Sequence, residues 1–172
     1  SEMCIRDSNE NTQSPRSKEC NYPIIKYLLQ QLYQFQDSTN EDKVANEISQ
    51  LYQTLQLTLD CLTKALFSCQ YYRFPLPLFR FLLVVPDEFR TLLYAKHPFA
   101  LKVLYIYASL CFVARFQMFK QYNIWRDFVV WYEHEIGLTD TVERSLFKLV
   151  VDQCFVVTSY EKFPLFDPIE LM

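Results

Sequence analysis

Only two histidines occur in this chain of 172 residues, and histidine is the side chain that most often performs acid–base chemistry near neutral pH. His97 precedes a proline at the expected start of a helix, and His134 falls in the last turn of another. A cation near the end of a helix interacts favourably with the helix dipole, which is a sufficient structural reason for His134. A nucleophilic cysteine–histidine pair would need a distant cysteine to meet one of these rings. We therefore predict no catalytic residues and no enzyme activity.

The flanks of His134 suggest a metal site, because Glu133 and Glu135 stand on either side of it. Side chains at i and i+2 of a helix point to opposite sides, so the two carboxylates cannot share an ion with His134. The cysteines contain no CxxC pair and match no zinc spacing. They are Cys4, Cys20, Cys61, Cys69, Cys111 and Cys154. We therefore predict no metal site. Most of the cysteines lie in apolar helical patterns, where a reduced cysteine acts as a small hydrophobic residue, so we predict an intracellular, reducing compartment.

Glycine is almost absent, since Gly137 is the only one in the chain. Dinucleotide-binding turns and phosphate-binding loops need several glycines, so both are excluded. Glycine-dependent hairpin turns are nearly excluded as well, which makes a β-rich fold unlikely. The net charge of −3 disfavours direct binding of nucleic acid by this chain.

Apolar residues recur at helical spacing along most of the chain. From Val44 to Cys69 they step by three or four, which predicts one helix over most of Glu41 to Gln70, with a coiled-coil seam as the alternative. The stretch from Pro98 to about Phe116 is apolar on nearly every side, which predicts a helix buried at the centre of the domain. Phe79 to Val85 could be a strand, but without a partner strand we interpret it as a helical turn or extended link.

Capping residues mark further helices. Asn123 and Gly137 suit the two ends of one helix, and Thr139 or Asp140 suits the start of the last. The tail from Tyr160 stays apolar and is expected to pack back on the domain. We predict an all-α fold, with a single domain of about six or seven helices around the central helix 98–116.

The first residues, SEMCIRDS, resemble the translation of a transposon-end adapter used to make sequencing libraries. A natural disordered start is the alternative, which the polar residues 9–19 would continue. We therefore treat residues 1–19 as a disordered or artefactual leader and residues 20–172 as the all-α domain.

Aromatic side chains are abundant, with 15 Phe, 12 Tyr and two Trp. Bulky aromatic cores are irregular, and irregular cores more often leave a cavity. Several rings of the central helix and its successor could therefore line a cavity for a rigid apolar ligand, with plain core packing as the alternative. These rings include Tyr105, Tyr107, Phe112, Phe116, Trp125 and Phe128.

The block from residue 80 to 137 resembles the C-terminal regulatory domain of fungal zinc-cluster transcription factors of the sterol-uptake-control class. The resemblance is carried by a proline with an acidic–aromatic pair, a Pro-x-Ala-Leu helix start, a Tyr-Ala pair and a tryptophan helix. Two features depart from the family: Ile124 stands where relatives often have glycine, and the six-cysteine DNA-binding cluster is absent. The residues that match are Pro86, Glu88, Phe89, Pro98, Ala100, Leu101, Tyr107, Ala108, Trp125 and Trp131.

The resemblance implies a regulatory domain that senses a sterol or another apolar ligand, with no other cofactor. The six rings Tyr105, Tyr107, Phe112, Phe116, Trp125 and Phe128 would then line the ligand site. DNA would be contacted only through an upstream zinc cluster, in a protein of the nucleus or cytoplasm. Further partners implied are a second copy, a coactivator or a chaperone. The alternative function is a helical protein-interaction or dimerisation module without a small-molecule ligand.

Overall fold

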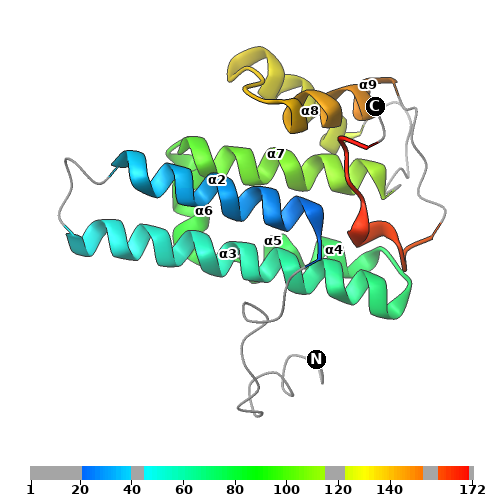
Figure 1. The fold of residues 1–172 in the computed structure, drawn as a ribbon, viewed down its shortest axis with the longest axis horizontal. Helices are drawn as coiled ribbons and strands as arrows, with labels where there is room; N and C mark the ends of the chain where they lie inside the picture. The colour runs from blue at the N-terminus through cyan, green and yellow to red at the C-terminus, as the bar shows by residue number, and fades with distance from the viewer. Residues whose placement is uncertain (1–20, 40–44, 115–122, 153–158, 171–172) are drawn as a thin grey trace, which may run out of the picture.

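The computed structural model describes residues 21–39, 45–114, 123–152 and 159–170, and within them the fold is all-α, as predicted. No strand occurs in these ranges. The described ranges contain six α-helices of eight residues or more and two of four residues, followed by a 3-10 turn. Figure 1 shows their arrangement. They are α2 (Pro23–Thr39), α3 (Ala45–Tyr72), α4 (Leu76–Phe79), α5 (Phe81–Val84), α6 (Asp87–Tyr94), α7 (Pro98–Val113), α8 (Ile124–Glu135), α9 (Thr141–Asp152) and η1 (Phe163–Leu165).

The predicted long helix is α3, which is continuous from Ala45 to Tyr72. Leu55, Leu62 and Leu66 are buried and Leu51 is half-buried, which confirms the face expected to point inward. Helix α2 lies along this face (Figure 1). The apolar stripe is thus covered by helices of the same chain, rather than left open as a coiled-coil seam.

The stretch after α3 forms two single helical turns, α4 and α5, and not a strand. Prolines at positions 75 and 77 stop α3 from continuing, because a proline inside a helix removes a hydrogen bond and clashes with the preceding turn. Val85 is extended, as the residue before a proline prefers, and Pro86 leads into α6.

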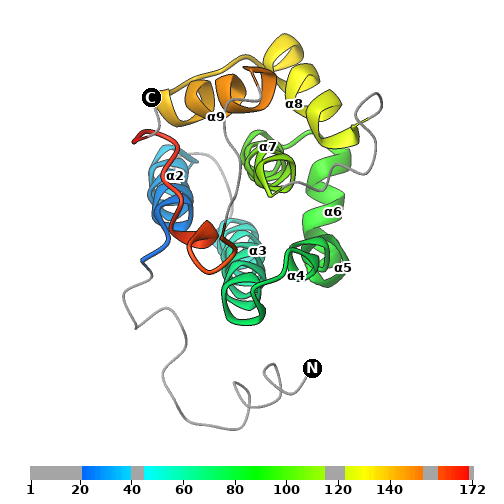
Figure 2. The ribbon, with the colours of Figure 1, turned by 90° about the vertical axis from the view of Figure 1, so that its right-hand side faces the viewer.

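Helix α7 is the core of the molecule and lies among α2, α6, α8 and α9 (Figure 2). Proline at its first position and the His97 ring, whose Nδ1 accepts from the Ala100 N–H at 3.4 Å, fix its start. The burial of α7 agrees with its apolar pattern: Val103, Tyr107, Leu110 and Cys111 are buried, and Leu104 keeps partial exposure.

The predicted caps of α8 and α9 are formed. Asn123 Oδ1 accepts from the backbone N–H groups of residues 125 and 126, at 3.0 and 3.2 Å. Gly137 takes φ +88°, the left-handed conformation that ends α8, and its N–H reaches the Tyr132 carbonyl. Asp140 Oδ1 accepts from the Glu143 N–H at 2.9 Å, which makes Asp140 the cap of α9.

The described part of the tail packs back on the domain, as expected. Phe163 and Phe166 are buried, and η1 lies against α3. The Tyr160 hydroxyl donates to the Ala114 carbonyl at 3.0 Å, and Gln70 Nε2 donates to the Glu161 carbonyl at 2.9 Å. These contacts tie the tail to the ends of both α7 and α3.

Candidate functional site

Four aromatic rings from four helices form one connected cluster beside α7. Phe81 lies 4.7 Å from Tyr107 and 6.4 Å from Phe89, measured between ring centroids. Trp125 meets Tyr107 edge to face at 5.4 Å. We call Phe81, Phe89, Tyr107 and Trp125 the aromatic cluster. Two of the predicted ligand-site residues, Tyr107 and Trp125, are therefore in direct contact.

Tyr105 belongs to a different cluster. Residues two apart on a helix are separated by about 200°, so Tyr105 and Tyr107 leave α7 on nearly opposite sides. The Tyr105 ring stacks on Tyr132 of α8 at 4.3 Å, and its hydroxyl donates to the Glu143 carbonyl of α9 at 2.7 Å. The Tyr107 hydroxyl donates instead to the Leu78 carbonyl of α4, at 2.9 Å. The predicted set thus divides between two sides of the central helix.

Two of the remaining predicted residues, Phe112 and Phe128, lie towards the end of α7 and along α8. Phe112 is buried, and Phe128 is half-buried against Trp131 at 5.4 Å. Phe116 lies outside the described residues. Four rings of the predicted set therefore meet other rings directly, and the two tyrosine hydroxyls already donate to backbone carbonyls.

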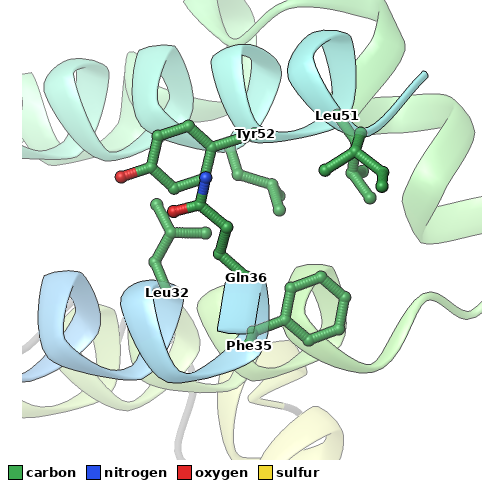
Figure 3. A pocket seen from close by; sticks show the side chains of 7 residues that line it. Leu32, Phe35, Gln36, Leu51 and Tyr52 are labelled. Atoms are coloured by element: carbon green, nitrogen blue, oxygen red, sulfur yellow. The ribbon is translucent and has the colours of Figure 1, made fainter. Parts of the chain in front are cut away.

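A hollow lies between α2 and α3, lined by residues of those two helices and by none of the predicted set. Figure 3 shows Leu32, Phe35 and Gln36 facing Leu51 and Tyr52 across it. Its volume is about 10 Å³, which is room for roughly one water molecule. In this conformation the hollow is far too small for a sterol.

The strongest polar cluster in the described residues surrounds Lys102, which α7 carries into a largely buried position. Its ammonium lies 2.7 Å from Glu143 Oε1 and 3.3 Å from Asp140 Oδ2. It also donates to the hydroxyl of Tyr27 at 3.2 Å and to the side-chain oxygen of Gln31 at 3.3 Å. Tyr27 in turn donates to Asp140. We call these five residues the Lys102 cluster; it joins α2, α7 and the start of α9.

The ionisation of the Lys102 cluster follows from its burial and its charges. Burial raises the pKa of Tyr27, and the nearby Asp140 and Glu143 carboxylates raise it further, so the phenol stays a donor. Burial alone would raise the pKa of Asp140. The Glu143 N–H, the Tyr27 hydroxyl and the Lys102 ammonium outweigh it and hold that pKa below its ordinary value of 3.8.

The buried polar side-chain atoms of the Lys102 cluster already have hydrogen-bond partners within the protein. Glu143 is wholly buried, and its carboxylate also accepts from the Thr139 hydroxyl at 2.9 Å. Among the described residues no buried side-chain nitrogen or oxygen lacks a hydrogen-bond partner. The ion pairs of the cluster hold α9 against α7, because separating these two helices would leave buried charges unpaired. Helix α2 is held to them by the hydrogen bonds of Tyr27 and Gln31.

Sequence reasoning missed the Lys102 cluster. Lys102 marked only the end of an apolar stretch, and Asp140 was expected only as a cap. One signal for the cluster was available in the sequence. Lys102 is the single charge in an otherwise apolar turn of a buried helix, and a buried charge needs a partner of opposite charge. Neither Tyr27 nor Glu143 could be assigned to it without knowing that α2 and α9 pack on α7.

The histidines and cysteines form no reactive group in the described parts of the chain. His134 is exposed and contacts Glu135 at 3.1 Å, while Cys61, Cys69 and Cys111 are thiols that form no disulfide with another described residue. Burial raises the pKa of Cys69 to about 11. Within the described ranges no group of three or more His, Cys, Asp or Glu could hold a metal ion. None of the helices described there is long and apolar enough to cross a membrane.

Comparisons with protein-family models, with curated proteins and with solved structures found no match for this chain. What the chain does is therefore inferred from its own residues and from the geometry of the aromatic cluster and the Lys102 cluster.

Proposed function

We propose that this chain is the ligand-sensing regulatory domain of a fungal zinc-cluster transcription factor and that its ligand is a sterol or another apolar molecule. The observation that carries the proposal is the aromatic cluster. Phe89, Tyr107 and Trp125 come from three separate motifs of the family resemblance and from three helices, α6, α7 and α8. Phe81 links Phe89 to Tyr107, and Trp125 contacts Tyr107 directly. Motifs that are far apart in sequence are thus parts of one packed unit.

The residues of the aromatic cluster differ in how deeply they are buried. Tyr107 is wholly buried and held by the Leu78 carbonyl at 2.9 Å, whereas Trp125 is half-buried in the first turn of α8. An apolar ligand enters between these rings, displaces Trp125 and takes its place against Tyr107. Because Trp125 begins α8, its displacement changes how α8 lies on α7. The ligand thereby stabilises one of two helix arrangements and alters the surface offered to partners.

A thermal melt with ergosterol tests this function. A ligand that binds only the folded chain stabilises it by about 2.7 kcal/mol at a hundred times its dissociation constant, so the melting temperature rises with sterol concentration. Trp125→Leu removes the ring that the ligand displaces, so in this variant the rise should begin at a lower sterol concentration. Tyr94→Leu, the same kind of change at a ring that is 89% exposed on α6, should leave the sterol dependence of the unmodified chain unchanged. An unchanged melting temperature of the unmodified chain at saturating sterol would remove the sterol-sensing function.

The second candidate function is a helical protein-interaction module. It is favoured by exposed aromatic rings at the end of α3 and just beyond it, where Phe67, Tyr71 and Phe74 are 45%, 63% and 54% exposed. Large apolar groups gathered on a surface mark sites that another molecule covers. This function predicts that substitutions at these rings weaken binding to a macromolecule without changing the response to sterol.

A further inference from the structure

Seven of the fifteen large hydrophobic side chains that are exposed in the described residues lie between positions 67 and 84. The end of α3 and the segment after it contribute Phe67, Tyr71, Tyr72, Phe74 and Leu76, each 45% to 63% exposed. Their rings are continuous: Phe67 stacks on Tyr71 at 6.2 Å, and Tyr71 meets Tyr72 at 5.0 Å. The side of the molecule formed by α3, α4 and α5 is opposite α8 and α9 in both views of the fold (Figures 1 and 2).

Helix α5 adds two exposed apolar side chains next to α3. Leu83 is 78% exposed and Val84 58% exposed. The thiol of Cys61 on α3 contacts the Val84 carbonyl at 3.7 Å, which places α5 directly beside α3. We call the exposed side chains from Phe67 to Val84 the α3–α5 surface.

The charges along the α3–α5 surface are mainly positive, and Asp60, one turn before Lys64, is the nearest carboxylate on α3. The chain has a net charge of −3, yet residues 61–86 contain Lys64, Arg73 and Arg80 and no carboxylate. All three cations are exposed. Glu161 of the tail lies 3.6 Å from Arg73. Lys64 lies one turn before Phe67 on α3, and Arg80 separates α4 from α5.

The charges and the apolar area together indicate which kind of partner could bind the α3–α5 surface. In a two-fold dimer the same patch of both copies faces itself, so Lys64 and Arg80 of two copies would share one contact and repel. Anionic lipid surfaces are recognised by clusters of about four to eight Lys or Arg, more than this surface carries. A helix with one apolar face and flanking carboxylates satisfies both the rings and the cations.

We propose that the α3–α5 surface docks an acidic amphipathic helix of a partner protein. Its apolar side chains lie against Phe67, Tyr71 and Leu83, and its carboxylates reach Lys64 and Arg80. Phe67 and Tyr71 are one helical turn apart on α3, so they match apolar residues spaced by three or four in the partner. This inference rests on the second candidate function and names its partner class; it is independent of sterol binding.

The test is a selection with displayed helical peptides against the whole chain. Each peptide carries leucines at a spacing of three and four, and every other position encodes Asp, Lys, Ser or Ala equally. We expect the selected pool to be enriched in Asp over Lys. A selected peptide should bind at least tenfold more weakly, about 1.4 kcal/mol, to the Lys64→Glu/Arg80→Glu variant. That variant should in turn select peptides enriched in Lys.

Matched controls separate this surface from general stickiness. Phe67→Ser with Tyr71→Ser should abolish peptide binding, whereas Tyr94→Ser with Ile124→Ser, at exposed apolar positions of α6 and α8, should leave it unchanged. Circular dichroism confirms that each variant is folded.

Several outcomes would overturn the proposal. Peptides selected without an excess of Asp would exclude an acidic partner while leaving the interaction module standing. No selected peptide at all would remove the interaction module too. A dimer in sedimentation equilibrium that Phe67→Ser dissociates would assign the surface to a second copy. Binding to phosphatidylserine vesicles that the same change abolishes, with no peptide preference, would assign it to a membrane.

Discussion

Replacing Lys102 by methionine removes the only cation of the Lys102 cluster while keeping a side chain of similar length. The apolar part of the lysine side chain is largely preserved, so the loss of packing is small. The change leaves the carboxylates of Glu143 and Asp140 without their ammonium partner. Glu143 is wholly buried, and its carboxylate cannot turn to water.

The burial of the three charges sets the magnitude. The side chains of Lys102, Asp140 and Glu143 keep 13%, 28% and 0% of their exposure, so the exposed-pair figure of about 0–1 kcal/mol does not apply. Removing one partner of a buried ion pair costs about 3–5 kcal/mol, because a charge is left buried and unpaired. That loss is a large part of a total stability of about 5–15 kcal/mol.

The assay is urea unfolding at pH 7, followed by circular dichroism. With a slope of about 2 kcal/mol per molar urea, the midpoint of the Lys102→Met variant should fall by roughly 2 M. Adding Glu143→Gln should recover part of the loss, since the second change removes the unpaired charge. Lys148→Met, at an exposed position of α9, is the control and should stay within about 0.5 kcal/mol of the unmodified chain. A Lys102→Met variant as stable as that control would refute the account of the cluster.

Three further predictions concern the core, a cap and pH. Leu110→Ala should lose about 2–5 kcal/mol in urea unfolding, and a loss below 1 kcal/mol would mean that α7 is not central. Gly137→Ala should lower the free energy of unfolding by about 1–2 kcal/mol, because alanine disfavours the left-handed φ of +88°. No atom lies within 4 Å of the new Cβ, so a steric clash adds nothing to this loss. Gly137→Asn should lose less, and equal losses for the two variants would contradict a backbone cause. The depressed pKa of Asp140 means that its contribution is present above the ordinary value of 3.8 and lost as pH falls through the folded value. The stability difference from Asp140→Asn should therefore shrink only below about pH 4, and a difference already fading at pH 6 would oppose it.

The helices could be predicted because their signals are local. The apolar stripe through Leu55 and Leu66 specifies one face of α3, and Asn123 and Gly137 supply the chemistry that starts and ends α8. Proline before an apolar run fixes the start of α7. Each of these patterns acts within one or two helical turns, so the sequence carries it in full.

The candidate site could be predicted only in part, because it depends on which helices meet. Tyr107 and Trp125 were expected together and are in contact, but Tyr105 lies on the far side of α7. The spacing of two between the tyrosines already implied this separation. The pairing of Lys102 with Glu143 is different in kind, since it joins elements about forty residues apart and follows only from the packing of α9 on α7.

The sterol-responsive regulatory function is tested most directly by a transcription reporter in fungal cells. The chain is fused to an unrelated DNA-binding domain, and reporter output is compared between cells depleted of sterol and the same cells supplied with ergosterol. The account predicts that output differs severalfold between the two conditions, that Trp125→Leu removes the difference and that Tyr94→Leu preserves it. Equal output in both conditions, with the fusion protein present in equal amounts, would contradict the account.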